Sequence, residues 1–205
     1  GIVRTWLQSC YPLRDSSGQV VGLNVVVQEI TERKRAEEAL QRLVACTLTS
    51  GPDFFRALTC ALTEALGVRY AFVAELLPTA DASGATCVRT IALWADGKQG
   101  ETMNYDLAGT PCADVVKQQT CFYPREVQCL FPADKLLAEM GVESYLGAPL
   151  RAADGTTLGL LVVMHDQPID ETLQPLALLQ IFAGHAAAEL ERMRNEQALR
   201  AGEER

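Results

Sequence analysis

The feature that most limits the fold of this chain is a sixteen-residue pattern that occurs twice. Residues 12–27 read PLRDSSGQVVGLNVVV and residues 149–164 read PLRAADGTTLGLLVVM, and the two copies share Pro-Leu-Arg, both glycines, one leucine and a Val-Val pair. In each copy, β-rich runs flank a short polar segment with glycine, which predicts a hairpin. Each hairpin leads into a helical pattern. Either hairpins converge on such residues, or the chain holds two domains of related design, the first represented only by its end.

The first hairpin opens the sequence. Trp6–Leu13 and Val20–Ile30 are rich in β-branched and aromatic residues, and Asp15-Ser16-Ser17-Gly18 between them is typical of a turn. A two-stranded hairpin is only marginally stable by itself in water. We therefore expect residues 1–30 to be the end of a larger sheet, without an independent core.

Turn and capping residues divide the rest of the chain. Thr31 suits the N-cap of a charged helix, and Gly51-Pro52-Asp53 marks the end of that helix. The next helix is expected over Phe54–Leu66 and ends at Gly67. Strands are then expected at Tyr70–Leu77, Thr86–Trp94, Thr102–Leu107, Ser144–Arg151 and Thr157–His165. Short helices are expected near Thr110 and over Pro132–Met140, and one long helix over about Glu171–Arg200.

Two helical segments carry apolar residues at the alternating spacing of four and three that is typical of a helix–helix seam. In the charged helix this seam follows Ala36 and includes Leu40 and Leu43. In the last helix it comprises Leu179, Ala183, Ala186, Leu190 and Met193. We expect these residues to form a homodimer interface. The alternative is that the last helix folds back on its own sheet.

Charge and cysteine content exclude several classes of protein. The net charge of −8 opposes binding to nucleic acids and to anionic membranes. No apolar run approaches the ~20 residues of a membrane span, and the N-terminus does not resemble a signal peptide, so any membrane anchor is expected outside this segment. The seven cysteines are odd in number and form no C-x-x-C pair, which favours a reducing cytoplasm over a disulfide framework or zinc site.

The N-terminal segment RTWLQSCYPLRDSSGQVVGLNVVVQEITERKRAEEAL resembles the C-terminal hairpin and exit linker of a PAS domain, with Glu29-Ile30-Thr31 in place of the usual Asp-Ile-Thr. From about Gly51 to Met193 the chain resembles a GAF domain of bacterial sensor histidine kinases and diguanylate cyclases. The motifs that carry this resemblance are YDLAGTPC at 105–112, CFYPREV at 121–127, LFPADKLL at 130–137 and SYLGAPL at 144–150.

This resemblance implies an α/β (α+β) fold with a central antiparallel sheet of five or six strands. The terminal helices would pack on one face, and short helices on the other would form a roof over a ligand pocket. The implied organisation is a PAS hairpin at 1–31, a linker helix at 32–50, a GAF domain at 51–193 and a coiled-coil exit helix at 194–205 towards an output domain. Helices of this kind usually pair in a homodimer.

The expected pocket residues are polar or aromatic and lie in or beside the motifs: Thr110, Cys112, Cys121, Tyr123, Phe131, Asp134 and Tyr145. Thr110-Pro111 predicts a helix start, which places Cys112 in the first turn, where the helix dipole favours a thiolate. The alternative is a capped structural helix with a buried thiol. Asp134 either braces the roof or contacts the ligand. No metal site and no bilin, haem or cyclic-nucleotide signature is visible, so a cofactor remains unknown.

Three functions compete on this basis. The first is a cytoplasmic regulatory domain that binds a small ligand or responds to redox state and signals to an output domain, with a histidine kinase favoured over a diguanylate cyclase. The second is a ligand-free transmitter. The third is a GAF-like methionine sulfoxide reductase. Its second reactive cysteine would be expected shortly before the Ser-Tyr strand, but residues 134–143 contain no cysteine. No catalytic residue is expected, because there is no P-loop and the neighbours of His185 do not resemble a kinase phosphoacceptor motif.

Overall fold

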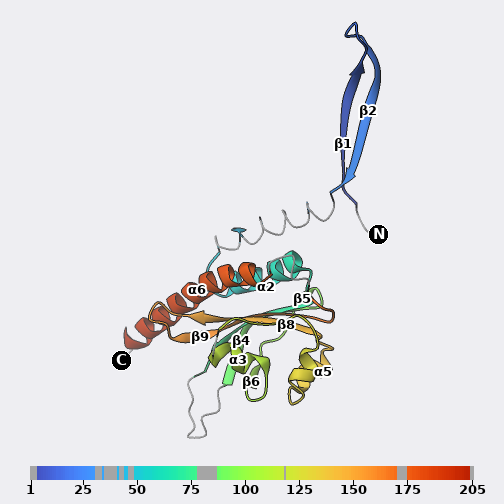
Figure 1. The fold of residues 1–205 in the computed structure, drawn as a ribbon. Coiled ribbons are helices and arrows are strands. Elements are labelled where there is room, and N and C mark those ends of the chain that lie inside the picture. The colour runs from blue at the N-terminus through green and yellow to red at the C-terminus, as the bar shows by residue number, and fades with distance from the viewer. Residues whose placement is uncertain are drawn as a thin grey trace.

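A computed structural model describes residues 4–30, 34, 41, 44–45, 49–77, 87–117, 119–169 and 175–203 of the chain. Two sheets are present in this part of the chain: a seven-stranded sheet with helices on both faces, and a two-stranded hairpin near the N-terminus (Figure 1). Thr31, Leu40 and Leu43 lie outside the described residues. None of the described helices has the length and apolar character needed to cross a bilayer.

The N-terminal hairpin forms where the sequence predicts it. Strand β1 (Trp6–Arg14) pairs antiparallel with β2 (Val20–Glu29). Its large hydrophobic side chains are 47–66% exposed, and none of residues 4–30 is buried. The hairpin therefore has no core of its own.

The main sheet has the order β5-β4-β3-β9-β8-β7, and β6 also pairs with β4. Every pairing is antiparallel, which confirms the predicted fold class. The sheet has seven described strands rather than five or six, because short segments at its two sides also pair. The strands are β3 (Tyr70–Leu76), β4 (Cys87–Ala95), β5 (Lys98–Gln99), β6 (Asn104–Asp106), β7 (Cys121–Tyr123), β8 (Ser144–Arg151) and β9 (Thr157–His165).

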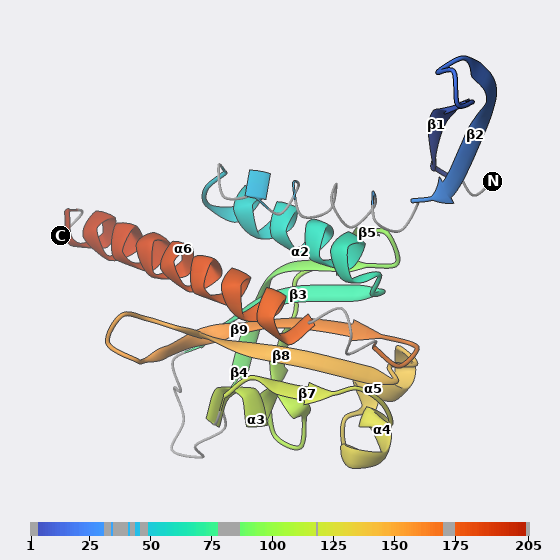
Figure 2. The ribbon, with the colours of Figure 1, turned by 45° about the horizontal axis from the view of Figure 1, so that its top comes forward.

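Two long helices cover one face of this sheet. Helix α2 (Pro52–Leu66) begins after Gly51 and ends at Gly67, which adopts the left-handed conformation that favours glycine. Helix α6 (Pro175–Glu203) lies beside it on the same face (Figures 1 and 2). Apolar side chains of both helices and of the central strands form one core cluster, in which each fully buried large side chain contributes about 1.5–3 kcal/mol.

The predicted seam of the last helix belongs to this core. Leu179, Ala183, Ala186 and Leu190 are at most 5% exposed and pack against the sheet and α2, with Met193 at the margin. These four side chains are already buried within their own chain, which favours the alternative that the last helix folds back on its own sheet. A spacing of four and three marks the face that a helix buries, whether the partner is a sheet or another helix.

Short helices cover the opposite face. They are α3 (Pro111–Lys117), α4 (Val127–Leu130) and α5 (Lys135–Glu139), all on the side of the sheet away from α2 and α6 (Figure 2). A second core cluster forms between these helices and the strands. The predicted short helix at 132–140 corresponds to α5. Helix α4 begins at the last residue of the CFYPREV motif and ends at the first residue of the LFPADKLL motif, where no helix was predicted.

The repeated pattern forms the same hairpin twice. In the β1–β2 hairpin the Arg14 guanidinium donates to the Gly18 carbonyl at 2.8 Å, and in the β8–β9 hairpin Arg151 donates to the Gly155 carbonyl at 3.2 Å. Both glycines have positive φ, 86° and 88°, and the register shifts next to the arginine in both copies. The two segments thus share their turn chemistry as well as their sequence.

Arg194 of helix α6 forms hydrogen bonds with the sheet. Arg194 Nη2 donates to the carbonyls of Leu76 and Leu158 at 2.9 and 3.0 Å, at one end of β3 and of β9, and lies 3.6 Å from Glu75 Oε2. A guanidinium presents several donors in a fixed plane, which suits two neighbouring carbonyls. The helix is therefore held to its own domain as far as residue 194.

Candidate functional site

A cavity of about 60 Å³ lies between the sheet and the roof. The sheet lines one side through β3, β4, β8, β9 and residues 103–105, which pair with β4, and the roof lines the other through α3, α5 and Met140. Apart from aliphatic side chains, its lining consists mainly of aromatic rings and thioethers, namely Phe72, Tyr105, Tyr145, Met103, Met140 and Met164. The site is thus largely apolar, as small-molecule sites usually are.

The Cys112 thiol lies between two tyrosines in this cavity. The hydroxyl of Tyr145 donates to Cys112 Sγ at 3.2 Å and that of Tyr105 at 3.6 Å. Burial raises the pKa of Cys112 to about 11, although both hydrogen bonds act in the opposite direction. Burial also raises the pKa of both tyrosines. All three groups are therefore uncharged at neutral pH, which favours the buried-thiol interpretation over the thiolate.

Asp134 is the carboxylate of the cavity. Its Oδ1 accepts hydrogen bonds from the amides of Leu136 and Leu137 at 3.1 and 3.4 Å, so the side chain caps α5. Burial raises the pKa of Asp134, and the two amides lower it. Its negative charge in turn raises the pKa of Tyr105 and of Cys112. Asp134 thus both braces the roof and directs a negative potential towards the cavity.

Of the seven expected pocket residues, Cys112, Asp134 and Tyr145 line the cavity, and the other four do not. Thr110 donates its hydroxyl to the Leu107 carbonyl at 2.8 Å in the turn before α3. The other three form a layer behind Tyr145. The ring of Tyr123 contacts the rings of Tyr145 and Phe131, and its hydroxyl donates to Asp114. Cys121 is partly buried and lies two residues before Tyr123 on β7. They support the wall of the cavity.

Sequence reasoning missed most of the cavity lining. Phe72, Leu93 and Met164 lie on strands β3, β4 and β9, and Tyr105 lies on the short strand β6. Strands β3 and β9 are buried on both faces, so the alternation that would distinguish cavity-facing from helix-facing positions is hidden. Tyr105 is the first residue of the YDLAGTPC motif, which also contains Thr110 and Cys112. In the part of the chain that the structure describes, no group of three or more His, Cys, Asp or Glu residues is arranged to hold a metal ion.

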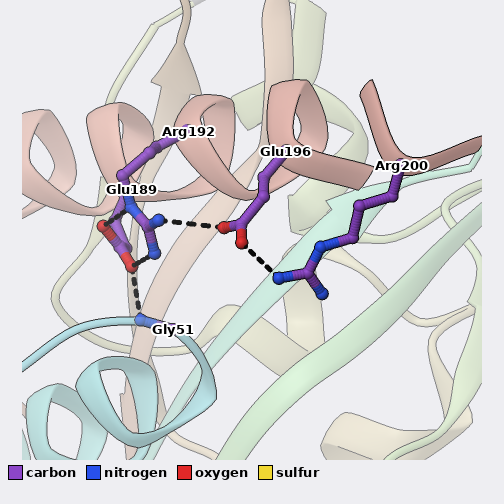
Figure 3. A network of polar contacts seen from close by, with 5 residues as sticks. All are labelled: Gly51, Glu189, Arg192, Glu196 and Arg200. Carbon is purple, nitrogen blue, oxygen red and sulfur yellow. Dashed lines mark hydrogen bonds and ion pairs between the residues drawn. The ribbon is translucent and has the colours of Figure 1, made fainter. Parts of the chain in front are cut away.

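A second polar cluster lies on the other face of the sheet (Figure 3). The carboxylate of Glu189 in α6 accepts a hydrogen bond from the backbone amide of Gly51, the N-cap residue of α2. Arg192 binds both oxygens of Glu189, at 2.7 and 2.9 Å, and also contacts Glu196, which pairs with Arg200. Glu189 thus ties the start of the domain's first helix to its last helix.

Comparison with known proteins identifies the fold family of this arrangement. The family model described as GAF domain matches residues 52–190. A phycoerythrobilin-bound GAF domain from a cyanobacterial phytochrome matches with a TM-score of 0.56 and 19% identity, covering 79% of this chain and 97% of that one. The GAF domain of an Acinetobacter phosphoenolpyruvate-protein phosphotransferase matches with a TM-score of 0.58 and 14% identity, covering 80% and 97%. Curated proteins give no match. At these identities the solved structures show the fold alone.

Proposed function

The chain belongs to the GAF domain family, and on this premise we propose that it is a sensory domain of a bacterial signal-transduction protein. In this proposal a small ligand occupies the cavity between the sheet and the roof, and α6 relays its presence to an output domain that follows in the same polypeptide. A histidine kinase is the favoured output and a diguanylate cyclase the alternative. The N-terminal hairpin is assigned to the end of a preceding PAS domain.

The observation that carries the ligand-binding function is the cavity itself. It joins an apolar lining to a few convergent polar groups, which is the usual composition of a small-molecule site. The state of Cys112 favours ligand binding over redox sensing, because reactive cysteines react as thiolates and this thiol is neutral and buried.

A ligand-free transmitter is the second candidate, and the Glu189 cluster favours it. The hydrogen bond from Gly51 to Glu189 joins the beginning of α2 directly to α6. In this candidate function, movement of the segment before Gly51 would pass to α6 through this contact without involving the cavity.

Homodimerisation remains part of the proposal, on a different face of α6 from the predicted seam. The outward positions 177, 181, 184 and 188 repeat at four and three residues and are exposed, with Ile181 60% exposed. Pairing of two copies would bury Ile181 and bring the small residues beside it into close contact. We expect Ile181→Glu to shift the sedimentation coefficient to that of a monomer, whereas Gln197→Glu does not. Unchanged sedimentation of Ile181→Glu would argue against this face.

The ligand-binding function is tested by native mass spectrometry of the chain purified under non-denaturing conditions. Leu136 is 40% exposed and lines the cavity, so Leu136→Trp is expected to obstruct it. Glu139→Trp adds the same bulk to an exposed position of α5 outside the lining. Retention of a small molecule by the unmodified chain and by Glu139→Trp, but not by Leu136→Trp, is the expected result. Equal retention by all three places the molecule elsewhere, and no retention by any of them favours the transmitter.

A further inference from the structure

The cavity has few hydrogen-bond donors to offer a ligand. The Thr90 hydroxyl donates to the Met103 carbonyl at 3.3 Å and accepts from the Met103 amide at 2.6 Å. Both tyrosine hydroxyls donate to Cys112. Among the lining side chains this leaves the weak thiol S–H as the remaining donor, so an anion would lose its water without gaining strong partners.

The same cavity offers a carboxylate that is incompletely engaged. Asp134 Oδ1 accepts two backbone amides, and within the described residues no hydrogen bond or ion pair engages Oδ2. The lining contains no Lys, Arg or His. A partly buried carboxylate without a counter-ion loses solvation, as the raised pKa of Asp134 reflects. A positively charged ligand would restore that lost stabilisation.

The apolar lining is also suited to an organic cation. The faces of aromatic rings carry negative potential and attract ammonium groups, and Phe72, Tyr105 and Tyr145 all line the cavity. Met103, Met140 and Met164 add polarisable thioethers that adapt to an irregular shape. Since a water molecule needs about 10–15 Å³ of such volume, the cavity of about 60 Å³ holds about four to six heavy atoms.

We propose that this cavity binds the head group of a small alkylammonium ligand, with Asp134 as the counter-ion and Tyr105, Tyr145 and Phe72 as the aromatic wall. This inference rests on the proposed ligand-binding function and specifies the chemical class of the ligand. A head of one nitrogen with three methyl groups matches the size of the cavity, and the rest of such a ligand extends past Leu136, which is 40% exposed, towards solvent.

Three probes of similar size test the charge requirement by isothermal titration calorimetry at 150 mM salt. Choline carries the cation, 3,3-dimethylbutan-1-ol replaces its nitrogen with carbon, and 3,3-dimethylbutanoate places an anion beside the same branched head. We expect choline to bind at least about tenfold more tightly than the neutral alcohol, and the carboxylate not to bind.

Two variants identify the counter-ion. Asp134→Asn removes the charge but keeps an N-cap as good as aspartate, so the roof helix is retained. Glu139→Gln removes an equal charge from an exposed position of α5 outside the lining. Asp134→Asn should abolish the preference for choline over the alcohol without changing the melting temperature by more than a degree or so, whereas Glu139→Gln should preserve it.

The possible outcomes separate this inference from the function on which it rests. Equal or tighter binding of the alcohol or the carboxylate would overturn the assignment of a cation while supporting a ligand pocket. Preference for choline that survives in Asp134→Asn would overturn the role of Asp134. Binding of none of the probes at millimolar concentration overturns the inference. In that case, native mass spectrometry of the same preparation decides whether the ligand-binding function stands.

Discussion

Replacing Glu189 tests how strongly the two ends of the domain are joined. The N-cap residue of α2 is Gly51, which has no side chain, and Glu189 accepts a hydrogen bond from its backbone amide, as the glutamate of a capping box does. Loss of an N-cap costs about 0.5–2 kcal/mol, and loss of a hydrogen bond to a charged group about 1.5–3 kcal/mol. The Glu189 side chain is only 14% exposed, so little of this interaction is screened by solvent. We expect Glu189→Ala to lower the free energy of unfolding by about 2 kcal/mol.

Two further variants separate the cap from the surrounding ion pairs. Glu189→Gln keeps an acceptor for Gly51 but loses the charge, and is expected to cost about 1 kcal/mol. Glu196→Gln breaks the pairs to Arg192 and Arg200 at a side chain that is 45% exposed, and is expected to cost at most about 0.5 kcal/mol. Urea unfolding with an unchanged m-value gives these differences. Equal costs for Glu189→Ala and Glu196→Gln would refute the capping role.

The difference in unfolding free energy between the unmodified chain and Glu189→Gln depends on pH through the pKa of Glu189. Arg192, and to a lesser extent the Gly51 amide, lower this pKa below its ordinary value of 4.5. A lowered folded-state pKa stabilises the protein fully above the unfolded-state value and loses that contribution as the pH falls through the folded-state value. The advantage of the unmodified chain over Glu189→Gln should therefore be constant at neutral pH and shrink below about pH 4.5.

Three further predictions concern other contacts. Gly159→Ala would place its Cβ 2.1 Å from the Ala74 carbonyl oxygen and should destabilise the protein by at least about 3 kcal/mol in urea unfolding, whereas Gly202→Ala meets open space in α6 and should be neutral or stabilise by up to about 1 kcal/mol. Cys112, with its pKa of about 11, should react with iodoacetamide at pH 7.5 far more slowly than the exposed Cys129, as peptide mass spectrometry would reveal; equal rates would contradict its burial. Arg194→Lys should speed amide hydrogen exchange in residues 195–203 nearly as much as Arg194→Ala, because a lysine does not reproduce the two-carbonyl contact.

The elements that the sequence predicted well have strong local signals. Gly51-Pro52 and Gly67 define both ends of α2, and the Asp154-Gly155 turn defines the β8–β9 hairpin. Strands β5 and β7 span two and three residues, too few for an alternating pattern, so their pairing depends on the neighbouring strands. Thr110-Pro111 correctly located the start of α3, but burial outweighs the dipole of a seven-residue helix at Cys112.

The candidate site was predicted less completely, because its composition depends on tertiary contacts. Three lining residues lie in the sequence motifs: Cys112, Asp134 and Tyr145. By contrast, Phe72 and Met164 come together only through the pairing of β3 with β9, whose register places Met164 opposite Tyr70, two residues before Phe72. The seam of α6 illustrates the same limit. Its spacing correctly identified the buried face from Leu179 to Leu190, but nothing in that spacing distinguishes a sheet from a second helix as the partner.

The attachment of Arg194 has a mechanical consequence for the last helix. Nine residues of α6 follow it, up to Glu203, and at 1.5 Å per residue they form a rod about 13 Å long. With Arg194 as the pivot, a tilt of about 5° moves the far end of this rod by about 1 Å. The same arginine is bonded to one end of β3 and of β9, the strands that carry Phe72 and Met164. A small shear between those strands would therefore tilt this part of α6 about Arg194, and the length of the helix would amplify the displacement at Glu203.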